Sequence, residues 1–210
     1  MSSVVIVDYE MGNLRSVAKA VERAGAAVCV TQDPAEVCRA DRLILPGVGA
    51  FPDAMAALRR RGLDLAVKDF VATGRPFLGI CLGLQLLCDV GLEVERCLGL
   101  GLMPGQCLAL PPDLRDAAGR RLKVPHMGWN SLQIVRRSPL LAGVPDGSQV
   151  YFVHSFVAVP SDPDAWVSTR TDYGSPFTSS VWRDNLFATQ FHPEKSQLVG
   201  LRMLENFVNM

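Results

Sequence analysis

The sequence predicts an α/β fold built on a mostly parallel central sheet. Its first half alternates short, uniformly apolar runs of strand length with segments whose apolar residues have helical spacing. Apolar runs without polar alternation are typical of strands buried on both faces, as in parallel sheets. The second half has shorter strand-like segments separated by turn residues, which predicts added antiparallel strands.

Four apolar runs in the first half predict buried strands, at residues 4–7, 27–31, 42–45 and 77–80. Segments with helical spacing accompany them, at residues 13–24, from Pro34 onward, between 52 and 72, and at 82–88. Asn13 has a side chain that can cap the first helix, and Gly25 can end it. Pro46 is expected to end the third strand, because proline lacks the N–H donor.

Six strand-like segments follow in the second half, at residues 131–135, 149–153, 156–159, 165–171, 179–183 and 186–190. Residues 111–121 are polar and predict an exposed turn or hairpin tip. Residues 197–208 place their apolar side chains at helical spacing and predict a closing helix. We see no repeat or linker, so we expect a single domain over residues 1–210.

The composition excludes several classes of protein. The 210 residues include 21 Lys and Arg against 21 Asp and Glu, so the basic footprint of a nucleic-acid binder is absent. Apolar residues make up 49% of the chain, too many for intrinsic disorder. No apolar run is long enough for a transmembrane helix, and the first residues lack the basic region of a signal peptide.

The six cysteines do not form a CxxC pattern, and a chain of this size does not need a disulfide scaffold. We therefore expect free thiols and a cytoplasmic protein, with most of the cysteines acting as small buried hydrophobes. Cysteine and histidine lack the usual zinc-ligand spacing, so we expect no metal site and no cofactor.

The strongest local signal is the segment around Cys81. A buried strand runs into Gly79-Ile80-Cys81-Leu82-Gly83 and then into a predicted helix. This pattern is typical of a nucleophile elbow, in which the nucleophile lies on a sharp strand-to-helix turn and flanking glycines let other backbone approach. The helix N-terminus would favour a thiolate. A buried structural cysteine at a strand end would give the same pattern.

A cysteine nucleophile needs a base, and His192 and Glu194 supply a candidate pair. Pro193 favours extended backbone at His192, and residues two apart in an extended segment share a face. Glu194 can then fix the tautomer of the imidazole. A solvated turn with a chance His-x-Glu is the alternative. We expect a Cys81–His192–Glu194 triad, following the logic of nucleophile, base and orienting group.

The segment Pro46-Gly47-Val48-Gly49 is a candidate oxyanion loop. In nucleophile-elbow enzymes one oxyanion donor is the amide after the nucleophile, here Leu82, and the other comes from a loop after a neighbouring strand. Two glycines suit a loop whose amides turn inward, although on its own this short motif is more typical of an ordinary turn.

These motifs together resemble the class I (triad) glutamine amidotransferase family, most closely the glutaminase subunits of imidazole glycerol phosphate synthases. The resemblance implies a class I glutamine amidotransferase-like (flavodoxin-like) fold. It extends over nearly the whole chain in the order of the family, through the stretches VDYEMGNLRSV (7–17), LPGVGAF (45–51), GICLGLQLL (79–87), KVPHMGWN (123–130), YFVHSF (151–156) and QFHPEKS (190–196).

The resemblance implies that glutamine is hydrolysed to glutamate and ammonia. The ammonia would pass to a (β/α)₈ cyclase subunit, the heterodimer partner, which makes imidazole glycerol phosphate and an aminoimidazole carboxamide ribotide in histidine biosynthesis. Cys81 would be the nucleophile, His192 the proton carrier and Glu194 its orienting group. The oxyanion would lie against the amides of Leu82 and of Val48 or Gly49.

The resemblance also implies residues that bind glutamine and the partner. The substrate-binding residues would be Gly47, Gln85, His154 and Ser155. The contacts with the cyclase would involve Met11, Asn13, Met127, Trp129 and Lys195. One position departs from the family, since Glu10 occupies a place where glycine is usual. Glu10 either has relaxed backbone angles or carries strain there.

Two other interpretations remain open from the sequence. The chain could be the glutaminase subunit of another synthase, such as pyridoxal phosphate synthase, which shares the elbow and the His-Pro-Glu turn. It could also be a scaffold that retains the fold without catalysis, although the intact Cys81, His192 and Glu194 argue against this.

Overall fold

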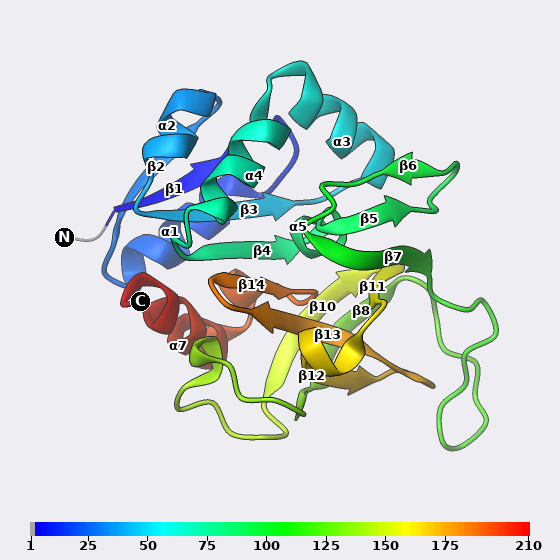
Figure 1. Ribbon diagram of the computed structural model, residues 1–210. Helices are drawn as coiled ribbons and strands as arrows, with labels where there is room; N and C mark the ends of the chain where they lie inside the picture. The colour runs from blue at the N-terminus through cyan, green and yellow to red at the C-terminus, as the bar shows by residue number, and fades with distance from the viewer. Residues whose placement is uncertain (1–2) are drawn as a thin grey trace.

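The computed structural model describes residues 3–210. These form an eight-stranded sheet between two layers of helices (Figure 1). The strand order is β2 (Ala27–Thr31), β1 (Ser3–Val7), β3 (Arg42–Gly47), β4 (Phe77–Cys81), β14 (Leu186–Thr189), β13 (Pro176–Arg183), β12 (Val167–Asp172) and β9 (Gln133–Ile134).

The first five strands in this order are parallel, and the last three pairings are antiparallel. The strand β14 comes from near the C-terminus yet pairs in parallel with β4, the strand that ends at Cys81. The predicted sheet, mostly parallel with antiparallel strands added by the second half, is therefore confirmed. The β4–β14 pairing also brings the two distant segments that carry the predicted triad next to each other.

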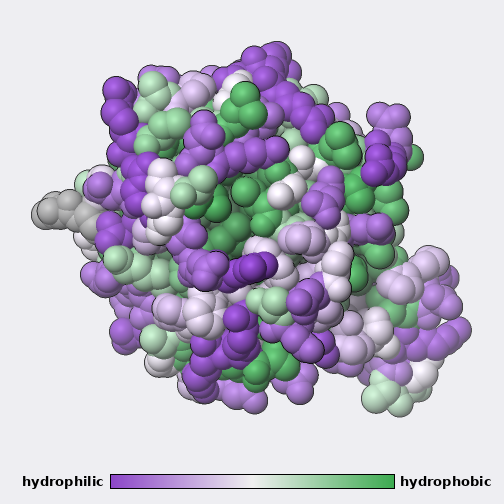
Figure 2. Space-filling model, viewed as in Figure 1, coloured by the Kyte–Doolittle hydropathy of each residue, from purple (hydrophilic) through white to green (hydrophobic). Residues whose placement is uncertain are grey.

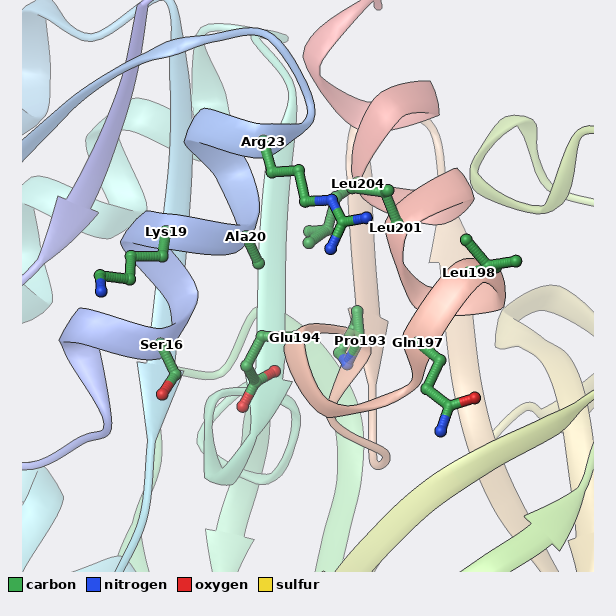
Figure 3. A pocket seen from close by; sticks show the side chains of 10 residues that line it. All are labelled: Ser16, Lys19, Ala20, Arg23, Pro193, Glu194, Gln197, Leu198, Leu201 and Leu204. Atoms are coloured by element: carbon green, nitrogen blue, oxygen red, sulfur yellow. The ribbon is translucent and has the colours of Figure 1, made fainter.

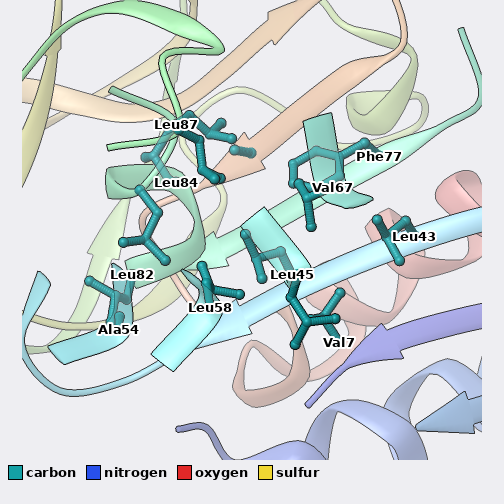
Figure 4. Close-up of a cluster of buried hydrophobic side chains, with 14 of the residues drawn as sticks. Val7, Leu43, Leu45, Ala54, Leu58, Val67, Phe77, Leu82, Leu84 and Leu87 are labelled. Carbon is teal, nitrogen blue, oxygen red and sulfur yellow. The ribbon is translucent and has the colours of Figure 1, made fainter. Parts of the chain in front are cut away.

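Helices cover both faces of the sheet. The helices α2 (Pro34–Arg39), α3 (Phe51–Arg60) and α4 (Leu63–Ala72) pack on one face, and α1 (Leu14–Arg23) and α7 (Gln197–Val208) pack on the other. Leu43 and Leu45 on β3 belong to the hydrophobic core on the side of α2, α3 and α4 (Figure 4). Ile44 between them belongs to the core on the side of α1 and α7. This explains why the parallel strands are uniformly apolar.

Two smaller sheets lie beside the central one. One is a two-stranded ribbon of β8 (His126–Ser131) and β10 (Gln149–His154), and the other contains β11 (Phe156–Pro160), β7 (Met103–Ala109), β5 (Cys88–Gly91) and β6 (Cys97–Leu98). Short helical turns complete the chain, namely α5 (Leu82–Gln85), α6 (Pro163–Trp166), η1 (Pro139–Leu141) and η2 (Pro193–Lys195). Seen from the side drawn in Figure 1, the surface is mostly hydrophilic around a central hydrophobic area (Figure 2).

Most expected elements are present, but three details were wrong. β3 continues through Pro46 to Gly47, because its pairing with β1 ends at Ile44 and Pro46 needs no donor on that side. The helix expected over 82–88 ends at Gln85, because the carbonyls of Leu86 and Leu87 accept hydrogen bonds from residues 100–103. The side chain of Asn13 makes no capping hydrogen bond, although this residue precedes α1.

The four strands β5 to β8 were not foreseen. The sequence analysis extended the preceding helix to Cys88, glycines interrupt the apolar pattern of residues 92–110, and the first strand expected beyond them began at residue 131. The stretch 111–121 is an exposed hairpin-like tip closed by a bridge between Arg115 and Arg121, as predicted. Within residues 3–210 no helix is both long enough and apolar enough to cross a membrane.

The closing helix should stabilise the fold through one face only. Phe207 on α7 is fully buried, whereas Leu198 on the same helix is 75% exposed. We expect Phe207→Ala to lower the free energy of unfolding by about 3–5 kcal/mol, because it removes a large buried side chain. Leu198→Ala is the matched control and should change the free energy of unfolding by less than about 0.5 kcal/mol. Urea unfolding of both variants measures these two free energies, and equal effects would contradict the described packing.

Candidate active site

Cys81 lies at the junction of β4 and α5 with unusual backbone angles. Its φ of 56° and ψ of −107° place it outside the regions that non-glycine residues ordinarily adopt. Such strain persists only where the surroundings hold it, and it is a feature of the nucleophile elbow. The geometry therefore agrees with the turn predicted from the glycine spacing.

The two glycines flanking Cys81 are required by close backbone contacts. A Cβ atom on Gly83 would lie 1.9 Å from the carbonyl oxygen of Leu45, and one on Gly79 would lie 2.8 Å from the carbonyl oxygen of Gly83. The turn after the nucleophile thus packs directly on the backbone of β3. Because α5 is a single turn, stabilisation of a thiolate comes from its first amides and only weakly from a helix dipole.

His192 and Glu194 form a buried pair. His192 Nδ1 lies 2.7 Å from Glu194 Oε1, and the two side chains are 3% and 1% exposed. The opposite nitrogen, Nε2, is buried and has no hydrogen-bond partner within the described chain. The carboxylate therefore fixes the proton on Nδ1 and leaves Nε2 as the base.

Charge interactions favour the protonated imidazole. Burial alone would lower the pKa of His192, but interactions with Cys81 and then Glu194 outweigh burial and raise that pKa to about 10. Cys81 raises the pKa of the ring first through hydrogen bonding and then through charge, although the Nε2 atom and the thiol do not form a hydrogen bond of ideal geometry. The arrangement can stabilise a thiolate–imidazolium pair.

The turn that carries His192 is held against β10. The His192 amide donates to the Tyr151 carbonyl (3.0 Å), and the Ser196 hydroxyl donates to the His192 carbonyl (2.7 Å) while accepting from the Tyr151 amide (3.0 Å). Gly200 lets α7 pack closely on the backbone of Pro193, since a Cβ atom at Gly200 would lie 1.9 Å from the Pro193 carbonyl oxygen. The base is therefore positioned by backbone contacts on two sides.

A pocket of about 310 Å³ opens in front of the thiol. This volume is at the lower end of small-molecule sites. Seven of the residues predicted for the site line it, namely Val48, Gly49, Cys81, Leu82, Gln85, His154 and Ser155. Glu93 also lines it and was missed, because nothing in its local pattern distinguishes it from an ordinary surface carboxylate. Glu93 Oε2 accepts a hydrogen bond from the Phe51 amide (2.7 Å), which holds a negative charge at the pocket.

The candidate oxyanion loop has free amides beside the nucleophile. Gly47 pairs with Cys81 across β3 and β4, and Gly49 has a φ of 94°, which glycine adopts without strain. Neither the Val48 nor the Gly49 amide donates a hydrogen bond within residues 3–210. Both residues also line the pocket at Cys81.

Tyr9 fixes the base of this loop. Its buried hydroxyl donates to the Pro46 carbonyl (2.9 Å), and burial, together with the charge of Cys81, raises the pKa of Tyr9 well above its ordinary value. A side chain at Gly47 would collide with that hydroxyl, since a Cβ atom there would lie 2.2 Å from it. Gly47 therefore shapes the loop, and its own contact with a substrate would come from backbone.

The polar side chains predicted to bind substrate are already hydrogen-bonded. Gln85 Nε2 donates to the Phe156 carbonyl (2.9 Å), and His154 uses both ring nitrogens, with Nδ1 bonded to the Phe156 carbonyl (3.0 Å) and Nε2 to His126 (3.0 Å). The imidazole of His154 therefore has no free polar atom. Its contribution to ligand binding would come from the backbone between β10 and β11, where Ser155 also lines the pocket.

The residues predicted for the partner interface are largely exposed. Met127 and Trp129 alternate on one face of β8 and are 63% and 46% exposed. Trp129 packs edge-on against Tyr151 of β10, and the Lys195 ammonium lies 5.8 Å from the centre of the same Tyr151 ring. This surface therefore lies over the strand that holds His192. Asn13 is exposed as well.

Residues 8–13 form a loop next to the oxyanion loop. The end of the Met11 side chain packs on Gly49, at 2.8 Å from the position of a Cβ there. Glu10 has a φ of 70°, so this residue carries the strain expected of a side chain at a glycine position. Its amide donates to Asp8 Oδ1 (2.8 Å), and its carboxylate pairs with Arg60 and Arg61, which holds the loop against the end of α3.

A second, larger pocket lies behind the His192–Glu194 pair. It has a volume of about 530 Å³, runs between α1 and α7, and has Glu194 in its wall together with Lys19 and Arg23 (Figure 3). Glu194 Oε2 is buried and has no hydrogen-bond partner in the described part of the chain. The wall of this larger pocket contains no cysteine. The candidate nucleophile lines the smaller pocket.

No group of three or more potential metal-ligating side chains occurs within residues 3–210. All six cysteines are free thiols.

Comparison with known proteins identifies the family. The model of the class I glutamine amidotransferases matches residues 5–210. Imidazole glycerol phosphate synthase subunit HisH of Syntrophotalea carbinolica is 52% identical over 99% of this chain and all of its own length. Subunit HisH of Geobacter sulfurreducens is 49% identical over the full length of both chains.

Solved structures agree on the fold. The PurLQS structure from Thermotoga maritima matches with a TM-score of 0.73 at 22% identity, over 99% of this chain and 98% of that chain. A crystal structure of a glutamine amidotransferase matches with a TM-score of 0.72 at 20% identity, over 98% and 99% of the two chains.

The chain therefore belongs to the class I glutamine amidotransferase family. Within this family it belongs with the HisH subunits of imidazole glycerol phosphate synthase, the glutamine amidotransferases that serve histidine biosynthesis. The resemblance read from the sequence motifs is confirmed. The alternative of a pyridoxal phosphate synthase subunit is wrong.

The buried histidine pair beside the pocket should make stability depend on pH. Burial lowers the pKa of His126 to about 4, and burial with the nearby His126 lowers that of His154 to about 3. The unfolded chain, with a histidine pKa of about 6.5, then binds more protons, so stability is full above this pH and falls as the pH drops from 6.5 toward 4.

Replacing His126 should weaken this dependence. We expect His126→Gln to reduce the loss of unfolding free energy between pH 7.5 and pH 5 by about 2 kcal/mol, because one group no longer titrates. Tyr173→Phe is the matched control, since the Tyr173 ring stacks on His126 with the ring centres 4.0 Å apart and the substitution leaves both histidines in place. Urea unfolding at the two pH values measures both, and an unchanged pH dependence in His126→Gln would refute the shifted pKa.

Proposed function

We propose that this chain hydrolyses glutamine through a Cys81–His192–Glu194 triad and delivers the ammonia to a cyclase subunit. The observation that carries the proposal is the buried His192–Glu194 pair, 2.7 Å apart, with the other imidazole nitrogen unpartnered beside the elbow cysteine. The glutamine amidotransferase family and the HisH relatives support the same reaction.

The reaction proceeds in two halves. The Cys81 thiolate attacks the side-chain amide carbon of glutamine, and His192 gives its proton to the departing nitrogen, so that ammonia leaves and a thioester remains. His192 then removes a proton from water, which attacks the thioester, and glutamate leaves as Cys81 recovers its proton. Glu194 holds the tautomer and stabilises the imidazolium in both halves.

Groups around the thiol match the charges that appear during the reaction. The amides of Leu82, Val48 and Gly49 would stabilise the oxyanion, and removal of one such donor typically costs about 10²–10³ in kcat. Glu93 is the charged side chain of the pocket wall and would hold the α-ammonium group of glutamine. Gln85 and the backbone of residues 154–155 would complete the binding of the substrate.

The partner follows from the relatives, each of which is named a subunit of a synthase. The exposed Met127 and Trp129 give an apolar area of the kind enriched at interface cores. With Met11, Asn13 and Lys195 they would contact a (β/α)₈ cyclase, which turns the ammonia into imidazole glycerol phosphate and the ribotide by-product. A cytoplasmic location accords with six free thiols, which persist in a reducing compartment.

Ammonia release from glutamine tests the proposal. We expect slow release by the chain alone and a large rise when the cyclase subunit and its nucleotide ligand are added. Cys81→Ala should lower the stimulated rate by more than about 10³-fold, because the nucleophile is lost. Cys29→Ala, which removes an exposed thiol, is the matched control and should leave the rate unchanged.

Two outcomes would contradict the proposal in different ways. Stimulated ammonia release that persists in folded Cys81→Ala would exclude the triad. A rate untouched by the cyclase subunit would keep the triad and exclude this partner.

A further inference from the structure

Gln190 touches the thiol from a side that the triad does not use. It follows β14 directly, is fully buried, and its amide is bonded to the Ser179 carbonyl (2.9 Å). Its side-chain Nε2 lies 3.7 Å from Cys81 Sγ, within hydrogen-bond reach of sulfur. Water cannot replace this contact, because the side chain has no exposed surface.

The orientation of the Gln190 amide is determined by its neighbour. The Phe156 carbonyl can only accept, so Gln85 must direct its NH₂ group toward that oxygen, at 2.9 Å. The same NH₂ group lies 3.2 Å from Gln190 Oε1. Gln190 therefore presents its oxygen to Gln85 and its N–H donor to the sulfur.

A chain of hydrogen bonds holds this arrangement in place. The Phe156 carbonyl also accepts from His154 Nδ1 (3.0 Å), which leaves His154 Nε2 to accept from His126 Nδ1 (3.0 Å). His126 Nε2 then accepts from the Asn130 amide (3.4 Å). The Phe156 carbonyl accepts from both His154 and Gln85, and the Gln85 NH₂ group is shared with Gln190 Oε1. The orientation of each side chain between Asn130 and Gln190 is therefore determined by its hydrogen-bonded neighbours.

A hydrogen bond donated to sulfur stabilises the thiolate more than the thiol, because it is stronger to the charged form. The other titratable groups that act on Cys81 are His192, Tyr9 and Cys107. Tyr9 is committed to the Pro46 carbonyl, and Cys107 is a neutral buried thiol whose pKa is raised. Gln190 is thus the uncharged donor aimed at the sulfur.

We infer that Gln190 is a positioning residue for the nucleophile, which holds the Cys81 sulfur in place and favours its thiolate through an N–H···S hydrogen bond oriented by Gln85. The inference rests on the proposed role of Cys81. Gln190 would be a fourth side chain of the site, from the segment after β14 that also contains His192. The neighbouring series of buried polar side chains would orient it.

Alkylation of Cys81 by iodoacetamide tests the inference without requiring glutaminase activity. The modified peptide is followed by mass spectrometry between pH 5 and pH 10. Gln190→Met keeps the volume and removes the donor, and we expect the alkylation rate at pH 7 to fall about tenfold, with the midpoint of the pH profile about one unit higher. Gln190→Asn, one methylene too short to reach the sulfur, should shift the profile in the same direction.

Thr189→Val is the matched control, since it removes a buried hydrogen bond from the adjacent residue (Thr189 Oγ1 to the Phe191 carbonyl, 2.9 Å) without touching the thiol. Its profile should equal that of the unaltered protein. The inference is overturned if either Gln190 variant with a cooperative unfolding transition keeps the unaltered profile, or if Thr189→Val shifts it equally. Retained glutaminase activity in Cys81→Ala would instead overturn the proposed function, so the two failures are distinguishable.

Discussion

The site depends on one backbone contact, between the turn at Gly83 and the carbonyl of Leu45 on β3. The two strands β3 and β4 are hydrogen-bonded neighbours, and the turn after β4 folds back so closely that only glycine fits. This contact holds Cys81 in left-handed backbone geometry and places the first amides of α5 beside the thiol. The strain at one residue is therefore maintained by the packing of the whole parallel sheet.

The same sheet brings the other functional segments together. β14 pairs with β4 along Leu186–Thr189, so Gln190 and His192 leave the sheet beside the strand end that carries Cys81. The turn at His192 is fastened to β10, and β10 pairs with β8, which displays Met127 and Trp129 at the surface. A partner that binds this ribbon would act on the strand that positions the base. Such coupling through directly bonded elements would give a partner subunit a physical route to the catalytic base.

Much of this arrangement could be predicted from the sequence, and the reasons for the exceptions are physical. The elbow at Cys81 and the His192–Glu194 pair were predicted because their spacing is a local property of the backbone. The length of α5 was not, because its end is determined by hydrogen bonds to residues 100–103. The roles of Glu93 and Gln190 were missed because both depend on contacts across more than 40 residues of chain. His154 was expected to face the substrate, yet its ring is occupied by His126, a partner from another strand.

The central claim is that the elbow singles out one of six thiols as the nucleophile. The most direct measurement is reaction of the protein with a chloroketone analogue of glutamine, followed by peptide mass analysis. The account predicts one adduct, on Cys81, formed much more slowly in His192→Ala. An adduct on an exposed thiol such as Cys29 with Cys81 unmodified would contradict it.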